Sequence, residues 1–173
     1  AFRAVEREEL LPTFNRLKEK HPDAEMKYFA RGRLWSSPEE ARRDAEATSE
    51  LVARTVIEPN LTEAVLTGDP EALAAFDELV RDGVLVDPTV TARVWAADGR
   101  IVYSDKPELI GDRYELDEDD LADLRSGGTD AGVSDLSKPE NRFERGYGEL
   151  LEVYTGVRAA DGGRAWSSDT GQM

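Results

Sequence analysis

Two arginines and a tyrosine lie within six positions of the stretch "SKPENRFERGYGELLEVY", in a chain whose formal net charge is −15. A planar guanidinium group presents parallel N–H donors that match the oxygens of a carboxylate or a phosphate. Arg142 and Tyr147 are therefore candidate ligand-binding residues for an anionic or polar small molecule, with Arg145 beside them. The alternative is that these arginines pair with Glu140 and Glu144 and fix a loop.

A second set of polar and aromatic residues lies on segments that alternate as β-strands do. Successive side chains of a strand point to opposite faces of the sheet. Arg93 and Trp95 therefore share one face of "VTARVWAA", and Glu152 and Tyr154 share one face of "LLEVYTGV". On the same side of a sheet they would line an aromatic pocket with charged groups inside. We add Tyr103, on "RIVYS", to these candidate ligand-binding residues. The open alternative is an Arg–Glu pair buried in the core.

The residues that usually carry catalysis or bind metal are scarce. The sequence has no cysteine and a single histidine, His21, which precedes a proline. It has none of the patterns "GxxxxGK[ST]", "GxGxxG", "GxSxG" and "HExxH". The acidic run Asp117–Asp120 has the oxygens that bind a divalent cation, but acidic residues also favour the first turn of a helix, which we expect here. We therefore expect no catalytic residue, no metal and no cofactor.

Charge is unevenly divided along the chain and indicates a boundary. Residues 1–35 hold 8 Lys and Arg against 6 Asp and Glu, whereas residues 36–173 hold 14 against 31. The change coincides with Ser36-Ser37-Pro38, so we expect a small separate segment at 1–35 and the main domain at 36–173. So acidic a surface repels phosphate backbones, which argues against a nucleic-acid partner.

The order of the predicted elements indicates an α+β fold. Ser37 and Glu40 form a capping box with Pro38 at the first helical position, and the helix should run to about Ile57. Asp98-Gly99 is a strong hairpin signal between "VTARVWAA" and "RIVYS". Further helices are expected near 60–68, 70–82 and 117–128, and further strands at "AGVSDL" and in a hairpin turning at 161–163. The last strand is poorly apolar. This order predicts an antiparallel sheet with segregated helices.

Two stretches carry a resemblance to a known family. "ARVWAADGRIVYSDKPELIGDRYEL" followed by "VSDLSKPENRFERGYGELLEVYTGVRAADGGR" is similar to the extracytoplasmic sensor region of bacterial, especially actinobacterial, membrane histidine kinases, over roughly residues 38–164. These are single Cache-type domains. The resemblance implies a long N-terminal helix packed on a PAS-like antiparallel β-sheet, with the "KPELIG" loop over the ligand side. Related citrate-sensing domains carry basic residues near the positions of Ile101 and Ser104, so citrate is not the expected ligand.

The resemblance also implies a function. The chain would be the ligand-sensing, non-catalytic input domain of a membrane-bound two-component sensor histidine kinase, in the extracytoplasmic part of that protein. It would bind a small molecule and form a homodimer through the helix that begins at Pro38. Two alternatives stay open. One is a protein-interaction domain without a small-molecule ligand, and the other is the sensor domain of another receptor type, such as a diguanylate cyclase or a chemoreceptor.

Overall fold

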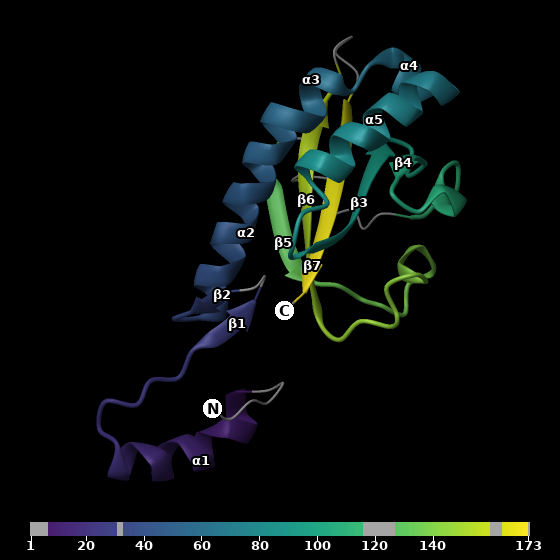
Figure 1. Cartoon of the computed structure of the whole chain (residues 1–173). Helices are drawn as coiled ribbons and strands as arrows, with labels where there is room; N and C mark the ends of the chain where they lie inside the picture. Colours follow the sequence, from purple (N-terminus) through teal and green to yellow (C-terminus); the bar gives the residue numbers. More distant parts are fainter. Residues whose placement is uncertain (1–6, 31–32, 116–126, 160–163, 173) are drawn as a thin grey trace.

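A five-stranded antiparallel sheet forms the centre of the protein, with strand order β4-β3-β7-β6-β5. The computed structural model describes residues 7–30, 33–115, 127–159 and 164–172. Figure 1 shows the sheet between the helices and a pair of long loops. The strands are β3 (Thr89–Ala96), β4 (Ile101–Ser104), β5 (Thr129–Val133), β6 (Leu150–Arg158) and β7 (Arg164–Gln172). The predicted α+β class, with a long helix against a PAS-like antiparallel sheet, is confirmed.

The long helix begins as its sequence predicts and continues further than expected. The side chain of Ser37 caps α2 (Pro38–Val52) by accepting the N–H of Glu40 at 3.2 Å. The chain then passes through a π-helix (Ala53–Ile57) into the short α3 (Glu58–Asn60). Pro59 has no N–H to donate, and the wider π turn lets the helical path continue past the expected end.

Two more helices complete the covering layer, and both have recognisable ends. The short α4 (Glu63–Thr67) ends at Gly68, whose φ of 85° is left-handed. The longer α5 (Pro70–Gly83) begins at Asp69, whose side chain accepts the N–H groups of Glu71 and Ala72. The expected helices near 60–68 and 70–82 are therefore confirmed.

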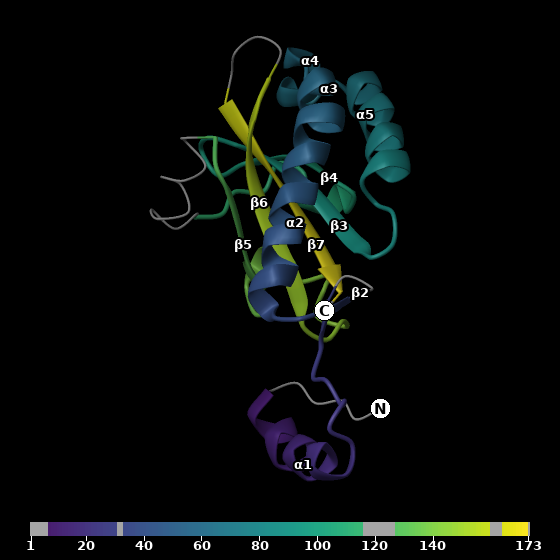
Figure 2. The ribbon, with the colours of Figure 1, turned by 90° about the vertical axis from the view of Figure 1, so that its left-hand side faces the viewer.

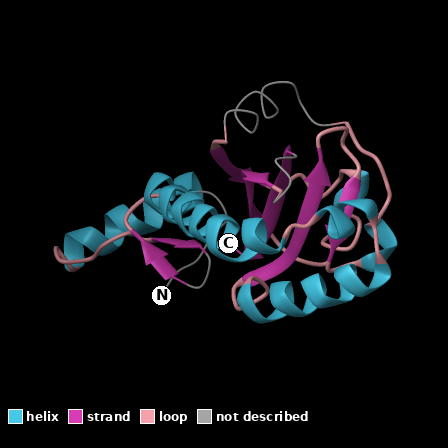
Figure 3. Ribbon diagram, turned by 90° about the horizontal axis from the view of Figure 1, so that it is seen from above, coloured by secondary structure: helices cyan, strands magenta, loops and turns pink. Residues whose placement is uncertain are grey.

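The main hydrophobic core lies between these helices and one face of the sheet. Figure 2 shows α2 crossing in front of the sheet with α5 beside it, and Figure 3 shows the same layers from above. Alternate residues of β3 point into this core, because Ala92 and Val94 are buried against the helices. The helices contribute a matching set of buried apolar side chains: Ala53, Ile57, Leu61, Val65, Phe76 and Val80.

Residues 7–30 and 33–35 contribute one helix and a small hairpin that precede the long helix. Figure 1 shows α1 (Arg7–Lys20) apart from the sheet, joined to it by an extended segment and the β1–β2 hairpin. The hairpin pairs β1 (Tyr28–Ala30) with β2 (Arg33–Trp35) and contacts α2. The domain boundary near Ser36–Pro38 stays a prediction. Among the described residues, no helix has the length and apolar character needed to cross a membrane.

The last strand has a more central position in the sheet than its sequence suggests. The poorly apolar C-terminal segment forms β7, which lies at the centre of the sheet and pairs with both β3 and β6. Its polar residues Ser168 and Thr170 are both buried, so β7 contributes hydrogen-bonding groups to the interior. The expected helix at 117–128 and the turn at 161–163 lie wholly or largely outside the described residues.

Candidate functional site on the loop-covered face

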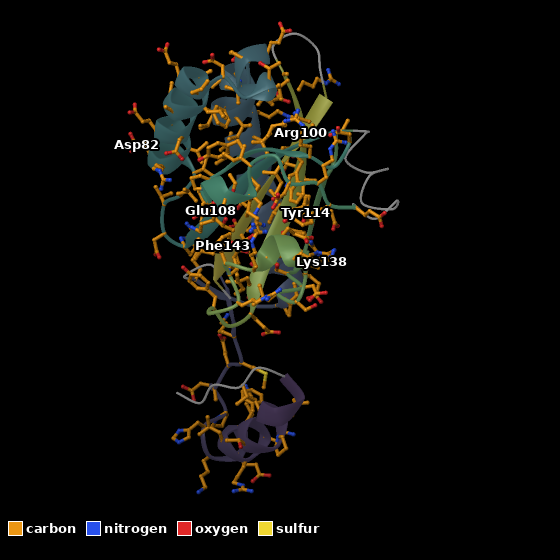
Figure 4. All side chains as sticks on the ribbon, turned by 90° about the vertical axis from the view of Figure 1, so that its right-hand side faces the viewer. Asp82, Arg100, Glu108, Tyr114, Lys138 and Phe143 are labelled. Carbon is orange, nitrogen blue, oxygen red and sulfur yellow. The ribbon has the colours of Figure 1, made fainter. Side chains whose placement is uncertain are left out.

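Two loops cover the face of the sheet opposite the helices. We name them the Leu109 loop (residues 105–115) and the Glu144 loop (residues 134–149). Figure 4 looks onto this side, where Glu108 and Tyr114 mark the first loop and Lys138 and Phe143 the second. The side chains beneath these loops come from the strands, so the sheet supplies a rigid floor to whatever the loops enclose.

The Leu109 loop is the segment that the resemblance places over the ligand side. Its leucine, Leu109, is completely buried and packs with Trp95 and Ile101 of the sheet. The loop folds back closely onto the β3–β4 hairpin, since a β-carbon at Gly99 would lie 2.2 Å from the carbonyl oxygen of Tyr114. A leucine of the chain itself therefore fills the space below this loop.

Arg93 lies beneath the Glu144 loop and is only 1% exposed. Its Nη2 is 2.7 Å from Oε2 of Glu144, which is itself 2% exposed. Its Nη1 donates to Oδ1 of Asn141 at 3.0 Å and lies 3.9 Å from Oε1 of Glu152. One guanidinium group thus meets two carboxylates and one amide in the interior of the domain.

Hydrogen bonding around this ion pair is incomplete. Nε and Nη2 of Arg93 and both carboxylate oxygens of Glu144 are buried without a hydrogen-bond partner among the described residues. The contact between Nη2 and Oε2 is short, but it is not aligned as a hydrogen bond. Charges taken out of water are well compensated only when their remaining donors and acceptors are also satisfied. The Arg93–Glu144 pair is therefore a weakly compensated part of the interior.

Glu152 and Tyr154 extend the polar cluster along β6. The Tyr154 hydroxyl donates to Oε1 of Glu152 at 3.0 Å. Burial raises the pKa of Glu152 above its ordinary value, while Arg93 and the hydrogen bonds from Tyr154 and Ser134 act in the opposite direction. Burial also raises the pKa of Tyr154 well above its ordinary value, and the adjacent Glu152 adds to the effect. At neutral pH the phenol therefore stays protonated and acts as a donor.

The structure brings four of the predicted site residues together on this face. Arg93 and Tyr154 are both register partners of Ser168 on β7. Trp95 is completely buried, and its Nε1 donates to the Ser168 hydroxyl at 3.2 Å. With Glu152 they form one continuous polar and aromatic cluster, as strand alternation predicted. Whether the cluster binds a ligand stays a prediction.

Tyr103 does not lie with this cluster. The register between β3 and β4 shifts between Val94 and Trp95, so that Val94 pairs with Tyr103 and Trp95 pairs with Ile101. The shift turns Tyr103 to the helix side, where its hydroxyl donates to Oδ1 of Asp77 at 2.9 Å. One extra residue in a strand moves the residues on one side of it to the opposite face of the sheet. Nothing in the sequence "RIVYS" indicates this extra residue.

Arg142 bridges the two loops. Its Nη1 donates to the Tyr114 hydroxyl at 2.8 Å, and its Nη2 donates to the carbonyl oxygen of Glu108 at 3.2 Å. Its acidic partner is Asp112, at 3.3 Å, rather than Glu140 or Glu144, the partners considered in the alternative. The arginine therefore connects the Glu144 loop to the Leu109 loop above the sheet.

Arg145 and Tyr147, which lie close to Arg142 in the sequence, are at the surface. Arg145 donates to the carbonyl oxygens of Leu136 and Ser137 at 3.1 and 3.2 Å, within its own loop. Tyr147 is 42% exposed. Arg145 therefore folds the Glu144 loop upon itself, and Tyr147 lies on its outer surface.

Among the residues that the structure describes, the loop-covered face is packed around Arg93, Trp95 and Leu109. Arg93, Trp95 and Leu109 are each 1% exposed or less. A cavity of about 220 Å³ lies elsewhere, between α2, the β2 strand and the segment that connects α5 to β3. The chain's own side chains thus fill this face, and Arg93 and Glu144 form a buried Arg–Glu pair there.

Three contributors to the cluster were missed by the sequence analysis: Glu144, Asn141 and Ser168. Glu144 was considered only as a partner for the nearby arginines, whereas its partner is Arg93 on a distant strand. Asn141 joins the Glu144 loop to Arg93 and also donates from Nδ2 to the hydroxyl of Ser134. The run "PENRFE" places Asn141 and Glu144 three positions apart, but a loop has no period from which an inward direction could be read.

Among the residues that the structure describes, no three His, Asp or Glu side chains are grouped closely enough to hold a metal ion. The acidic run Asp117–Asp120 lies outside them.

Comparison with known proteins gives a likeness of fold. No protein-family model matches the chain, and no curated protein matches it significantly. Among solved structures it is similar to the sensor domain of DcuS from E. coli, at 16% identity and a TM-score of 0.48, over 75% of this chain and 90% of that one. It is also similar to an extracellular ligand-binding receptor from Desulfohalobium retbaense DSM5692, at 16% identity and a TM-score of 0.46, over 76% of this chain and 23% of that one. At such identities the chemistry of the site has to come from the chain's own residues.

Proposed function

We propose that this chain is the extracytoplasmic, ligand-sensing input domain of a membrane-bound sensor histidine kinase, and that the domain itself is non-catalytic. The resemblance of residues 38–164 to such sensor regions motivates the proposal. The observation that carries it is Arg93, a buried guanidinium group whose Nε and Nη2 have no hydrogen-bond partner among the described residues. Such donors suit a small anionic or polar molecule.

The position of Arg93 suits a sensor. The guanidinium group is attached to β3, in the sheet, and is contacted by the side chains of Glu144 and Asn141 from the Glu144 loop. A guest on Arg93 would meet Tyr154 and Trp95 as well, so that donors and an aromatic wall converge on one place. Binding there would alter the contacts of the Glu144 loop, and the neighbouring β6 packs against α2 on its other face.

A thermal-shift screen of small acids, amino acids and sugars tests the proposal. A compound that binds only the native protein raises its melting temperature. Tyr154→Phe and Tyr103→Phe form a matched pair, because each removes one hydroxyl group, from the loop-covered face and from the helix side respectively. We expect Tyr154→Phe to weaken binding and Tyr103→Phe to leave it unchanged. A library without any stabilising compound, or equal effects of both variants, would refute the proposal.

One observation favours a second candidate function, a protein-interaction domain without a small-molecule ligand. The loop-covered face is packed, while Phe143 and Tyr147 of the Glu144 loop are 39% and 42% exposed. Exposed aromatic side chains are common at protein interfaces. This candidate predicts that no small molecule stabilises the domain and that Phe143→Ser and Tyr147→Ser keep the wild-type melting temperature while a protein partner no longer binds.

A further inference from the structure

The contact between Arg93 and Glu144 has the composition of a receptor with its ligand in place. A fixed guanidinium group on the sheet meets a carboxylate that arrives from a loop, at 2.7 Å. Asn141 orients the guanidinium group from the other side by accepting from Nη1 at 3.0 Å. A free molecule with a carboxylate group could occupy the same position, since the contact uses nothing of Glu144 except its charged end.

The contact of Arg93 with Glu144 is incompletely hydrogen-bonded for a buried ion pair. Both carboxylate oxygens of Glu144 lack a hydrogen-bond partner among the described residues, although Glu144 is only 2% exposed. In water the same carboxylate would regain its full hydration. A guest carboxylate that lies better aligned on Nε and Nη2 would satisfy donors that Glu144 leaves unsatisfied.

The loop is built so that Glu144 can leave without moving the sheet. Asn141 and Arg142 anchor its first part, through Ser134 and through the Leu109 loop. Beyond Glu144 the chain is exposed from residue 145 to residue 149. A β-carbon added at Gly146 or Gly148 would meet no heavy atom within 4 Å. Residues 143–149 therefore have room to move outward around their anchored base once the exposed hydrogen bonds from Arg145 to Leu136 and Ser137 are broken.

The charge around Arg93 selects the class of guest. Glu152 lies 3.9 Å from Arg93 in addition to Glu144, so two carboxyl groups already face one guanidinium group. An additional anion would be repelled, whereas the exchange of one carboxylate for another leaves the charge unchanged. Phosphate, with about −1.5 to −2 charges near neutral pH, would add negative charge beside Glu152.

We propose that Glu144 is an internal occupant of a carboxylate-binding site on Arg93, and that a small carboxylate exchanges with it and frees residues 143–149. The biological meaning of this exchange rests on the proposed sensing function, but the exchange itself can be tested without the natural ligand. The probe is acetate, the end of a glutamate side chain as a free molecule, compared with chloride at equal ionic strength.

The first experiment removes the internal carboxylate and supplies it from solution. Glu144→Ala should melt below the wild type in chloride and recover in acetate. Once acetate exceeds its dissociation constant, each tenfold increase should raise the folded-to-unfolded ratio about tenfold. The wild type should respond much less, because its own carboxylate is tethered beside Arg93 at a high effective concentration. If Glu144→Ala does not fold in chloride, we expect its refolding yield to rise with acetate concentration, and to rise more than the refolding yield of the wild type.

Two variants are matched controls. Glu140→Ala removes another buried carboxylate of the same loop, 6% exposed, and should not be rescued by acetate. Arg93→Met combined with Glu144→Ala replaces the ion pair by an apolar side chain and should also be indifferent to acetate. Equal responses of Glu144→Ala and Glu140→Ala, or a response of the double variant, would overturn the assignment of the site.

Hydrogen exchange of the wild type tests the release of the loop. The amide of Tyr147 donates to the carbonyl oxygen of Glu144 at 2.9 Å, and the amide of Glu144 donates to that of Asn141 at 3.1 Å. Both amides should exchange faster as acetate replaces chloride, while amides within β6 stay unchanged. If acetate stabilises Glu144→Ala but does not speed the exchange of these two amides in the wild type, the proposed release of residues 143–149 is refuted.

These results are separable from those of the ligand screen. A screen compound that binds equally well to the wild type and to Glu144→Ala would leave the sensing function standing and refute the role of Glu144. Rescue by acetate in a protein that no screen compound stabilises would establish the carboxylate site and refute ligand sensing.

Discussion

Nη1 of Arg142 donates a hydrogen bond to the hydroxyl of Tyr114 at 2.8 Å and thereby joins the two loops that cover the sheet. Nη2 of the same arginine reaches the carboxylate of Asp112 at 3.3 Å. The clustering of arginines in the sequence had suggested a residue at the mouth of a ligand pocket. The observed contacts indicate a structural role for Arg142, since its guanidinium donors already bond to groups of the Leu109 loop.

Arg142→Ala should lower the melting temperature and leave the affinity of the folded protein for any screen compound unchanged. Arg142→Lys keeps the charge but not the planar fork, so it should recover only part of the loss. Thermal denaturation and binding would be measured on the same preparations. A loss of affinity at an unchanged melting temperature would instead assign Arg142 to the binding site.

The pH dependence of stability should report on Glu152. Burial raises the pKa of this carboxyl group in the folded protein above its ordinary value of 4.5. The folded state therefore holds this proton more tightly than the unfolded state. The contribution of Glu152 to stability is fully present below pH 4.5 and is lost as the pH rises through the raised folded pKa.

Glu152→Gln isolates this contribution, because the amide keeps an acceptor for Tyr154 but does not titrate. The free energy of unfolding of the wild type, minus that of the variant, should fall with rising pH above about 4.5, by at most about 1.4 kcal/mol per pH unit. Urea denaturation between acid and neutral pH measures the difference. A difference that is constant, or that grows with pH, would mean that the pKa is not raised.

The elements fixed by neighbouring residues were the ones that the sequence predicted. The cap at Ser37 and the hairpin at Asp98-Gly99 depend on contacts within a few positions, and both form as expected. The face of Tyr103 depends on a register shift between β3 and β4, which is set by how two strands pair and not by either strand alone.

The central position of β7 and the role of Glu144 were unpredictable for a related reason. A strand with Ser167, Ser168 and Asp169 in succession has no apolar period, and its place is decided by β3 and β6 on its two sides. Glu144 points inward because Arg93 attracts it. Four residues of the cluster were predicted from alternation, whereas the partner that closes it comes from a loop.

The Leu109 loop should depend on its buried leucine. Leu109 is completely buried against Trp95 and Ile101, and its replacement would leave a cavity there. Leu109→Ala should reduce the free energy of unfolding by about 2–5 kcal/mol. Leu79→Ala is the matched control, because Leu79 is 42% exposed on α5 and should change stability by less than about 1 kcal/mol. Urea denaturation of both variants measures these changes. Equal reductions in the free energy of unfolding would show that Leu109 does not hold the loop in place.

The outer face of α2 should mediate weak self-association. Leu51 is 62% exposed, and Ala47, Thr48 and Thr55 beside it are exposed as well, while Ala45, Ser49 and Ala53 face the sheet. This stripe is small and mildly apolar, and one leucine contributes at most about 3 kcal/mol when it is buried. We therefore expect a dimer that forms only at high concentration when the domain is isolated.

Leu51→Glu should abolish this dimer, because the two introduced carboxylates would repel each other across the interface, whereas Leu79→Glu, on α5, should not. Sedimentation equilibrium at millimolar protein compares the three proteins, and a wild type that remains monomeric there would contradict the proposed dimer.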